Sequence, residues 1–476
     1  MDRFAAGAGR EPDPLTLEAR DLAFATDLYQ LTMAGAYHAL AGAGRLPERA
    51  VFELWVRRFP PHRNFLVFAG LEPALASLGA LRFERDQLDW LRGLDVFAHV
   101  PASFFDELAA FRFRGDVRAM AEGTLFFPGE PVLSVSGSLL EAQIVETLLL
   151  SIVNFQVAIA SKAARLRLAA GPRATLAEFG GRRAHGPQAA TWAARAAWVG
   201  GCDATSNVLA GYRLGIPVVG TMAHSYVMSF EREIDAFRHY QSCYPEHTIH
   251  LVDTYDTLEG VRRALATGRP FRGVRLDSGD LAALAPAVRR LLDEGGRPDA
   301  LIFASGDLDE HRIARLVADG APIDSFGVGT ELATSYDAPA LSGVYKLVET
   351  VAGGQRELTY KASAGKEMFP GAKQVVRAAG AGGVFTGDRV VPAAAGEPAG
   401  EGLLRPVMRA GRILGREDLA AARARCLDQL ARLPAPLRAL EVADRPYPVS
   451  FDPAFGELLE RAKERTGAVP RHATAR

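Results

Sequence analysis

Short apolar runs, each followed by polar or glycine residues and then by a helical pattern, recur between residues 174 and 332. This repeat is typical of parallel β/α units, in which each strand leads into the helix that carries the chain to the next strand. The six segments are ATLAEFGGRRAHG (174–186), IPVVGTMAHSY (216–226), TIHLVDTYDT (248–257), FRGVRLDSGDL (271–281), ALIFASGDLDE (300–310) and IDSFGVGTEL (323–332). The pattern predicts an α/β region with parallel strands.

The polar residues that follow these strands are expected to meet, because parallel strands place all their carboxyl ends on one edge. A parallel barrel builds its active site on that edge. The set combines carboxylates, cations and glycines: Glu178, Arg182, Arg183, Thr221, His224, Asp253, Arg275, Asp277, Asp280, Ser305, Gly306, Asp307, Gly327 and Gly329. Such a set suits a phosphorylated, metal-bound substrate.

The chain before this region mixes helices with short strands. Residues 1–20 are rich in Gly, Pro and charge, which predicts a flexible leader. Alternation at 51–59 predicts a strand, and 112–136 predict an antiparallel meander. After residue 137, a long apolar run predicts one or two buried helices. Helical spacing appears in four earlier segments, 26–40, 64–78, 83–94 and 101–111.

The chain after residue 344 returns to short strands, followed by helices at 416–432 and near 453–465. Antiparallel segments therefore lie on both sides of the β/α region, and the simplest arrangement joins the two flanks in one discontinuous domain. We expect three parts, which are the leader 1–20, an α+β sandwich-like domain from 21–138 plus 346–476, and an irregular, TIM-like parallel α/β barrel over 139–345.

Composition indicates a soluble globular enzyme. The 476 residues are enough for two or three domains. Apolar residues make up 48% and charged residues 23%, a balance typical of such enzymes. The net charge of −1 argues against nucleic acid or an anionic membrane as the main partner.

The cysteines and the amino terminus indicate a reduced, cytoplasmic compartment. Cys202, Cys243 and Cys426 lie far apart and lack metal-ligand spacing. The first 24 residues have no apolar core, so we expect neither a signal nor a transit peptide. The longest apolar candidate for a membrane span, 142–155, contains Glu146. We therefore expect no membrane span.

His224 is the first candidate for chemistry. It follows the strand that ends in Gly220 and Thr221, and Ser225 comes next. A lone histidine is more often a buried side chain with satisfied hydrogen bonds. At the carboxyl end of a parallel strand, however, imidazole can act as acid, base or nucleophile near neutral pH. We therefore take His224 as a catalytic candidate.

The segment RLDSGD brings one guanidinium and two carboxylates together. Strand alternation puts Arg275 and Asp277 on the same side. The two could form a merely structural ion pair. A second carboxylate, Asp280, follows a Ser-Gly turn and better fits a Mg²⁺ or ribose-hydroxyl site. Asp277 and Asp280 are therefore the candidate Mg²⁺ ligands.

Glycine turns follow two successive strands, at SGD (305–307) and FGVGT (326–330). Turns need glycine in any case, so one such turn carries little information. Barrels, however, often bind phosphate with backbone N–H groups of the loops after their last strands. Two turns in that order therefore favour a phosphate site.

The segment EFGGRRAHG (178–186) places two arginines beside an aromatic ring. A surface arginine pair usually just faces solvent. At a strand end next to Phe179, the pair could instead bind an anion while the ring stacks on a planar group. The chain has no G-x-x-x-x-G-K-[ST] loop, G-x-S-x-G elbow, H-E-x-x-H motif or dinucleotide fingerprint.

Many motifs in a fixed order resemble the nicotinate phosphoribosyltransferase family. The resemblance runs from TDLYQLTM (26–33) to PYPVSFDP (446–453), nearly the whole chain beyond the leader. Between them lie FELWVRRFP, EGTLFFPGEPVL, EAQIVETLLLSIVNFQ, EFGGRRAHGP, GTMAHS, LVDTYDT, GVRLDSGDL, IDSFGVGTEL, YKLVE and PGAKQV. The resemblance implies a decorated α/β barrel, a sandwich-like domain built from both flanks, and a head-to-tail homodimer with shared active sites.

The resemblance also implies a reaction. The family joins nicotinate to 5-phosphoribosyl 1-diphosphate and releases nicotinate mononucleotide and diphosphate, a salvage step in NAD biosynthesis. The transfer uses Mg²⁺ and is coupled to hydrolysis of ATP, the co-substrate, through a phosphorylated histidine. His224 matches that histidine.

Roles for other residues follow from the same resemblance. Phe179 and Tyr29 would sandwich the pyridine ring, with Tyr29 supplied by the neighbouring subunit. Arg182 and Arg275 would contact the carboxylate or phosphate, and Arg275 and Asp277 count among the catalytic residues. Asp277 would also bind the ribose hydroxyls, and Thr221 the nicotinate.

The resemblance assigns the remaining substrate contacts mainly to phosphate. Two pairs of residues would hold the 5′-phosphate, and two lysines would add charge for phosphate: Gly306, Asp307, Gly329, Thr330, Lys346 and Lys373. Asp203, Ser225 and Gly327 are further substrate-binding candidates. The chain departs from the family at Met368, where threonine is common, and at Ala372, where a basic residue is common, while Lys366 and Lys373 remain.

Three alternatives stay open. Nicotinamide could replace nicotinate as substrate, although the length of the chain and FGGRRAHG favour nicotinate. A non-catalytic relative could bind mononucleotides, although no proposed catalytic position is lost. A phosphate-binding aldolase would need a Schiff-base lysine on a strand, and none lies on the predicted barrel strands.

Overall fold

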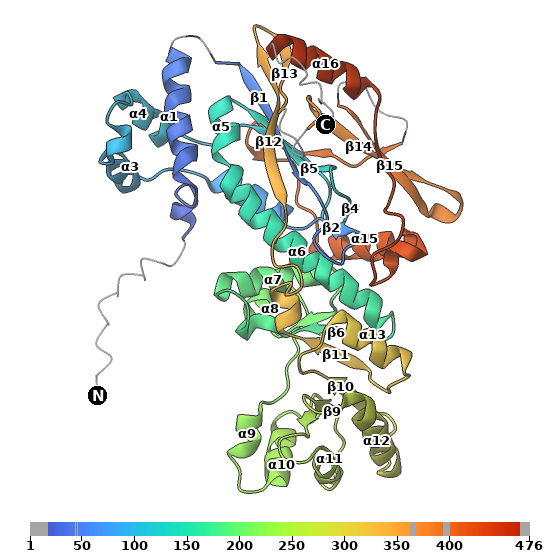
Figure 1. The fold of residues 1–476 in the computed structure, drawn as a ribbon. Helices are drawn as coiled ribbons and strands as arrows, with labels where there is room; N and C mark the ends of the chain where they lie inside the picture. Colours follow the sequence, from blue (N-terminus) through green and yellow to red (C-terminus); the bar gives the residue numbers. More distant parts are fainter. Residues whose placement is uncertain (1–17, 43, 45, 362–367, 394–399, 467–476) are drawn as a thin grey trace, which may run out of the picture.

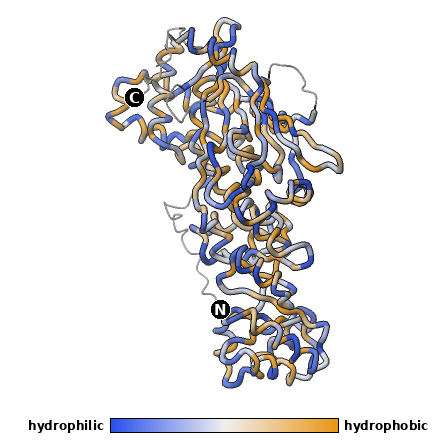
Figure 2. The backbone as a smooth tube through the Cα atoms, turned by 45° about the vertical axis from the view of Figure 1, so that its right-hand side comes forward, coloured by the Kyte–Doolittle hydropathy of each residue, from blue (hydrophilic) through white to orange (hydrophobic). Residues whose placement is uncertain are grey.

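The computed structural model describes residues 18–466 except 43, 45, 362–367 and 394–399. It is an elongated α/β molecule (Figure 1). The two flanks of the chain lie together at one end, and the β/α units of 174–332 extend to the other. Apolar and polar stretches alternate along the whole length of the molecule (Figure 2), so both ends have apolar residues for a core. Residues 1–17 of the predicted leader lie outside the described part.

A six-stranded parallel sheet forms the β/α region, which confirms the prediction of parallel strands. Its strands are short and mostly buried, as expected for strands covered on both faces. In spatial order they are β7 (Ala204–Thr205), β6 (Thr175–Glu178), β11 (Ser325–Val328), β10 (Leu301–Ala304), β9 (Gly273–Leu276) and β8 (Ile249–Leu251).

Two details of this sheet differ from the prediction. The strand expected at 216–220 is reduced to one parallel bridge between Thr205 and Val218. The sequence gives no signal for β7, because a two-residue strand is too short to show periodicity. Within the described residues, no strand pairing joins the edge at Val218 to β8.

Helices follow these strands, and several begin at a polar residue just after a strand. Asn207, Asp256, Asp280 and Asp309 each accept hydrogen bonds from backbone N–H groups of the first turn. Such caps satisfy donors that the helix leaves open. The helices are α7 (Pro187–Val199), α8 (Val208–Leu214), α9 (His224–Met228), α10 (Glu233–Cys243), α11 (Thr257–Leu265), α12 (Leu281–Glu294), α13 (Glu310–Ala318) and α14 (Thr330–Ala333).

The flanks contribute jointly to a seven-stranded antiparallel sheet. In spatial order the strands are β13 (Gln355–Leu358), β12 (Gly343–Ala352), β1 (Arg49–Val56), β5 (Pro131–Gly137), β3 (Asp116–Ala119), β17 (Arg405–Arg409) and β18 (Arg412–Ile413). The strand that joins the two flanks is β1, which pairs on one side with β5 of the amino-terminal flank and on the other with β12, from beyond residue 342. The antiparallel meander predicted at 112–136 is confirmed in part, because β3 pairs with β5 but the strand between them, at Leu125–Phe126, pairs elsewhere.

Two smaller sheets complete the flanks. A four-stranded sheet follows the order β16 (Glu401–Gly402), β14 (Lys373–Ala379), β15 (Phe385–Pro392) and β19 (Val449–Phe451), and a two-stranded one joins β2 (Leu66–Val67) to β4 (Leu125–Phe126). The helix predicted at 64–78 is therefore partly wrong. Gly70 adopts a left-handed φ of 98°, so the helix starts only at Leu71.

The other predicted helices of the flanks are present. They are α1 (Leu28–Gly42), α2 (Leu71–Ala80), α3 (Arg85–Arg92), α4 (Ala102–Ala109), α5 (Leu139–Ile144), α6 (Glu146–Ala170), α15 (Leu419–Arg432) and α16 (Ala454–Thr466). Together α5 and α6 are long and apolar enough to cross a membrane by length and composition alone. Within their most apolar window 72% of the residues are buried, so this is a core helix.

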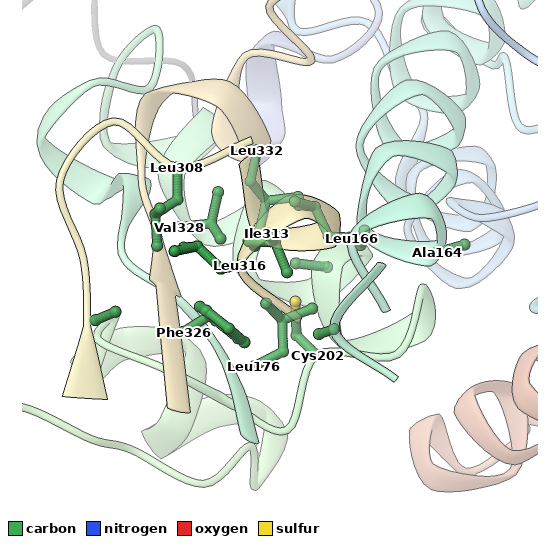
Figure 3. Close-up of a cluster of buried hydrophobic side chains, with 14 of the residues drawn as sticks. Ala164, Leu166, Leu176, Cys202, Leu308, Ile313, Leu316, Phe326, Val328 and Leu332 are labelled. Atoms are coloured by element: carbon green, nitrogen blue, oxygen red, sulfur yellow. The ribbon is translucent and has the colours of Figure 1, made fainter. Parts of the chain in front are cut away.

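A buried apolar cluster joins α6 to the parallel sheet (Figure 3). Leu166 of α6 packs in the same core as Leu176 of β6 and Phe326 of β11. Leu308 and Leu332, which follow β10 and β11, belong to it as well. The loops at the carboxyl ends of two strands are thus anchored by apolar side chains.

His250 of β8 makes stability depend on pH. It is fully buried between Phe237 and Phe271, and neither ring nitrogen has a hydrogen-bond partner among the described residues. Burial lowers its pKa to about 3. The unfolded chain binds this proton near pH 6.5. The contribution of a neutral His250 is therefore complete above pH 6.5 and is lost as the pH falls toward 3.

We expect the free energy of unfolding to fall by about 2 kcal/mol between pH 7 and pH 5 through this group. Urea unfolding at several pH values measures the change. His250→Leu should flatten the pH dependence, whereas His247→Gln, at an exposed position, should not. An unchanged pH dependence in His250→Leu would contradict the assignment.

Candidate functional site

A pocket of about 370 Å³ opens at the carboxyl edge of the parallel sheet. It draws residues from the segments after β6, β7, β8 and β9 and from the segment around Val218. The lining residues are Phe179, Gly181, Arg182, Ser206, Asn207, Gly220, Thr221, Met222, Ala223, His224, Leu251, Arg275 and Asp277. The structure thus brings seven of the residues predicted from the sequence to one pocket: Phe179, Arg182, Thr221, His224, Arg275, Asp277 and, through its bond to Asp277, Ser305.

Arg275 holds three segments of this pocket together. Its Nε donates to the Ser305 hydroxyl (2.8 Å), and its Nη1 donates to the Thr221 hydroxyl (3.0 Å). Its Nη2 donates to Asp277 Oδ1 (2.7 Å), which also accepts from the Ser305 hydroxyl (2.5 Å). Burial opposes ionisation of Asp277, but the Ser305 hydroxyl and Arg275 outweigh it and lower the pKa of the carboxyl. Asp277 is therefore a carboxylate in a fixed orientation.

His224 begins α9 at the mouth of the pocket, with 39% of its side chain exposed. Its Nδ1 lies 3.2 Å from Thr254 Oγ1, and its Nε2 lies 3.7 Å from Asp277 Oδ2. The imidazole is therefore oriented from one side and accessible from the other. This arrangement rejects the alternative of a buried histidine with satisfied hydrogen bonds.

Asp253 and Asp277 each have one carboxylate oxygen that accepts no hydrogen bond from the described residues, although Asp277 Oδ2 lies 3.7 Å from His224 Nε2. Asp253 Oδ2 accepts from the Asp277 backbone N–H (2.9 Å) and the Ser278 hydroxyl (2.6 Å), while its Oδ1 is buried and has no partner. Asp280 caps α12 through Oδ1. The described residues contain no cluster of three or more His, Cys, Asp or Glu side chains with metal-site geometry. A Mg²⁺ ion held by one or two carboxylates plus substrate phosphates fits this donor set.

Aromatic rings form one wall of the pocket. Phe179 stacks on Phe303 with ring centroids 5.4 Å apart, and the Arg275 guanidinium lies 5.8 Å from the Phe179 centroid. Gly327 has no side chain, and a Cβ there would come within 2.9 Å of both phenyl rings. The predicted site residue Gly327 therefore makes room for the aromatic wall.

Arg182 is the free cation of this pocket. Glu178, buried below it, accepts from the Thr205 hydroxyl and the Gly180 N–H, which fixes the turn that carries Arg182. Burial raises the pKa of Glu178. The exposed Arg182 guanidinium makes no hydrogen bond or ion pair with any residue that the structure describes. It is thus available to an anionic ligand.

The two glycine turns lie directly after β10 and β11. Gly306 and Asp307 both adopt positive φ, 89° and 45°. A Cβ at Gly306 would lie 1.9 Å from the Asp277 carbonyl oxygen, so only glycine fits. Gly329 precedes the first residue of α14, Thr330. The turns therefore present backbone at the carboxyl edge, as predicted.

Lys346 and Lys373 lie in a second pocket, in the flanking sheets. Their ammonium groups lie 3.4 Å from Glu146 Oε1 and 2.8 Å from Glu53 Oε2, respectively. This pocket of about 260 Å³ is lined by Glu53, Trp55, Arg57, Gly129, Pro131, Lys346, Lys361, Met368, Phe369, Lys373 and Phe451. Figure 1 shows β12 and β14, which carry the lysines, at the opposite end of the molecule from α9.

Three other predicted residues also lie outside the first pocket. Tyr29, on α1, is 48% exposed and belongs to the flanking region. Ser225 is exposed on α9 but does not line the pocket. Asp203 forms ion pairs with Arg167 and Arg423 and accepts from the Leu176 N–H, which gives it a structural role within this chain.

The two departures from the family pattern lie near the second pocket. Met368 lines it, and the backbone N–H of Ala372 donates to Glu349. Lys366 lies outside the described residues.

Comparison with known proteins agrees with this geometry. Residues 24–154 match the nicotinate phosphoribosyltransferase N-terminal domain, and 159–339 match the quinolinate phosphoribosyl transferase C-terminal domain. A nicotinate phosphoribosyltransferase of Mycobacterium tuberculosis is 44% identical over 442 residues, which are 91% of this chain and 92% of the relative. The chain belongs to the nicotinate phosphoribosyltransferase family. A Bacillus subtilis member is 45% identical over 365 residues, 75% of this chain and 73% of its own.

Solved structures support the same membership in this enzyme family. Human nicotinic acid phosphoribosyltransferase superposes with a TM-score of 0.80 at 31% identity, covering 91% of this chain and 99% of the human one. A nicotinate-nucleotide pyrophosphorylase of Pyrococcus furiosus gives a TM-score of 0.70 at 27% identity, covering 89% and 99%. The resemblance inferred from the motifs is thereby confirmed.

Sequence reasoning missed several lining residues of both pockets. Ser206 and Asn207 follow β7, the strand without a sequence signal. Arg57 and Lys361 add two cations to the second pocket. Arg57 comes directly after the alternating strand β1, and this position at a strand end could have marked it as a candidate site residue.

Gly306→Ala tests whether the first glycine turn needs a residue without a side chain because it packs tightly against Asp277. The added methyl group would collide with the Asp277 carbonyl and displace both the turn and the carboxylate. We expect kcat/KM for phosphoribosyl transfer to fall roughly 100-fold, the scale of a 1 Å misplacement. Gly320→Ala is the matched control, since φ is +69° there and a Cβ meets open space. Equal activity in the two variants would contradict the fit.

Proposed function

We propose that this family member transfers the phosphoribosyl group of 5-phosphoribosyl 1-diphosphate to nicotinate, a step of NAD biosynthesis that salvages nicotinic acid. The products are nicotinate mononucleotide and diphosphate. The observation that carries the proposal is the single pocket lined by Phe179, Arg182, His224, Arg275 and Asp277. It offers an aromatic wall, a free guanidinium and a fixed carboxylate at one mouth.

Nicotinate is a planar ring with a carboxylate, and the pocket offers a partner for each part. Phe179 supplies a ring face for stacking. Arg182 supplies an unpaired fork, whose geometry matches a carboxylate. Arg275 already has three protein partners, so its charge acts mainly through the orientation of Asp277 and Thr221. A cation at this position favours nicotinate over the neutral nicotinamide.

The transfer forms a bond from the pyridine nitrogen to the anomeric carbon while the bond from that carbon to the diphosphate oxygen breaks. The bonding electrons leave with diphosphate, and positive charge develops on the ribose. Asp277, ionised and held by Arg275 and Ser305, would accept hydrogen bonds from the ribose hydroxyls and stabilise that charge. Binding both substrates in line supplies much of the rate.

The 5′-phosphate is assigned to the turns at Gly306–Asp307 and Gly329–Thr330. Both turns expose backbone at the edge of the sheet where Asp277 lies. Mg²⁺ would be held by Asp277 and Asp253 together with substrate phosphates, with Asp280 as the further predicted ligand. When bound, Mg²⁺ neutralises the charge that develops on the diphosphate.

ATP hydrolysis is assigned to His224. An imidazole nitrogen would attack the terminal phosphorus of ATP, breaking its bond to the ADP oxygen, and water would later cleave the phosphohistidine. The exposed ring at the pocket mouth supports this role. Placed beside the diphosphate, a phosphorylated His224 could change the affinity for substrates and products, which would couple the two reactions.

We also propose that the parallel sheet curls into an irregular, TIM-like barrel. The segments β6, β7, Val218, β8, β9, β10 and β11 follow one another in space in chain order, with one unpaired step between Val218 and β8. Val219 and Ile249, on either side of that step, pack against one cluster with Ala177, Ala204 and Phe303. We propose the same two domains as from the sequence, the barrel over 139–345 and the sandwich-like domain over 21–138 plus 346–476.

We propose a head-to-tail homodimer with shared sites. Helix α1, which carries Tyr29, and strands β12 and β14, which carry Lys346 and Lys373, belong to the flanking part of the molecule, whereas α9, which begins at His224, lies at the opposite end (Figure 1). In a head-to-tail pair these groups of one protomer would face the first pocket of the other. A cytoplasmic location agrees with three free cysteines among the described residues.

The catalytic proposal is tested by incubating the protein with nicotinate, 5-phosphoribosyl 1-diphosphate and Mg²⁺, with and without ATP. We expect mononucleotide in both cases and a higher yield with ATP. His224→Ala should lose the ATP effect and the acid-labile phosphoryl group while keeping basal transfer. ATP stimulation that survives in His224→Ala would reject the phosphohistidine, and a higher kcat/KM for nicotinamide than for nicotinate would reject the substrate.

The shared site is tested by complementation. Tyr29→Ala and Asp277→Asn should each be impaired, because each removes one half of every site. A mixed dimer regains one site in which both residues are intact. Coexpression of the two variants should therefore give more activity than the mean of the two separate proteins. Activity equal to that mean would mean that each protomer works alone.

A further inference from the structure

A buried ion cluster lies beneath the two glycine turns, outside the catalytic pocket. At its centre is Lys162 of α6, which is 2% exposed. Its ammonium nitrogen lies 2.6 Å from Glu310 Oε2, 2.9 Å from Asp337 Oδ1 and 3.6 Å from Glu331 Oε2. One cation thus contacts three carboxylates.

The positions of two of these carboxylates in the chain are informative. Glu310 is the first residue of α13, three residues after Asp307 of the first turn. Glu331 directly follows Thr330 of the second turn. The same ammonium group therefore connects the exits of both turns, although they are consecutive loops of different β/α units.

Other residues of the cluster fasten it to the rest of the molecule. Arg165 Nε donates to Glu310 Oε1 (2.8 Å), and its Nη1 donates to the Leu440 carbonyl (3.1 Å). Arg63 donates to both oxygens of Asp337 (2.6 and 3.0 Å) from the segment before β2. These hydrogen bonds thus fix the position of the turns relative to α6 and to the flanking region.

Apolar side chains also connect the two loops to α6. Leu308 and Leu332, one from each loop, belong to the same buried core as Leu166 of α6 (Figure 3). Apolar packing alone tolerates substitution and small shifts. The ion pairs, in addition, set the distance between the Lys162 ammonium group and each loop.

Stability alone is a poor explanation for this cluster. Replacing a buried ion pair with apolar residues of similar volume is often neutral or stabilising. Burial opposes ionisation of Glu310, yet Lys162 and Arg165 outweigh it and lower the pKa of the carboxyl. The charges are therefore retained at a desolvation cost, and precise placement is what they provide.

We propose that Lys162 is a positioning residue that sets the distance between the two turns that bind the 5′-phosphate of the ribose. The inference rests on the proposed function for the location of that phosphate. Lys162 lies outside the lining of the catalytic pocket and acts through Glu310 and Glu331. It is a determinant of phosphate affinity and not of pyridine recognition.

The test is binding of ribose 5-phosphate, which carries the 5′-phosphate without the diphosphate, measured by isothermal titration calorimetry. In Lys162→Met we expect the Kd to rise about tenfold, within the range that a displaced binding group costs. Lys162→Arg, which keeps the charge, should recover part of the affinity. In turnover, KM for 5-phosphoribosyl 1-diphosphate should rise while KM for nicotinate stays within about twofold of wild type.

Arg195→Met is the matched control. Arg195 of α7 is a buried cation that pairs with Glu122 and donates to Gln156 of α6, the helix that carries Lys162, and none of its ion pairs or hydrogen bonds with described residues involves either turn. It should lose stability without the selective loss of phosphate affinity. An equal rise in Kd in both variants would reduce Lys162 to a structural residue and overturn the proposal.

Lys162→Met removes the ammonium group that Glu310, Asp337 and Glu331 share, and the variant could fail to fold. Glu331→Gln then decides, because it weakens only the longest link, to a side chain that is 23% exposed. A several-fold rise in Kd supports the proposal, and an unchanged Kd overturns it. These outcomes differ from failure of the proposed function, which is absence of mononucleotide in the wild type, because ribose 5-phosphate binding needs no turnover.

Discussion

The Arg275 guanidinium is the group on which the arrangement of the first pocket, at the carboxyl edge of the parallel sheet, depends. Its three nitrogens donate to residues of three different segments, Thr221, Asp277 and Ser305. A guanidinium at the end of a buried strand requires such partners, because a desolvated charge without them is costly. Satisfying one cation therefore aligns the loops and also fixes the Asp277 carboxylate. His224 is placed relative to that carboxylate.

Many residues of the first pocket could be predicted from the sequence, because parallel β/α units place the carboxyl ends of their strands side by side. Thr221, His224 and Asp277 each come just after an apolar run, and that position alone predicted that they would meet. The helix starts were accessible for a similar local reason, since Asp256 and Asp309 occupy capping positions.

The remainder depends on contacts that no local pattern encodes. A two-residue strand such as β7 has no periodicity, so Ser206 and Asn207 were missed. Lys162 lies within an apolar helical run, and only the fold shows that Glu310 and Glu331 converge on it. The placement of Lys346 opposite Glu53 likewise follows from the pairing of β1 with β12, across some three hundred residues of chain.

That pairing has a consequence for biosynthesis. During translation β1 can pair early with β5, but its other edge waits for β12, whose residues 343–352 emerge long afterwards. An unpaired strand edge is a template for association with other chains. Contacts between distant parts of a chain also form slowly. The nascent polypeptide therefore exposes an unpaired edge of β1 until the ribosome has completed the whole β/α region. During this interval the chain depends most on chaperones.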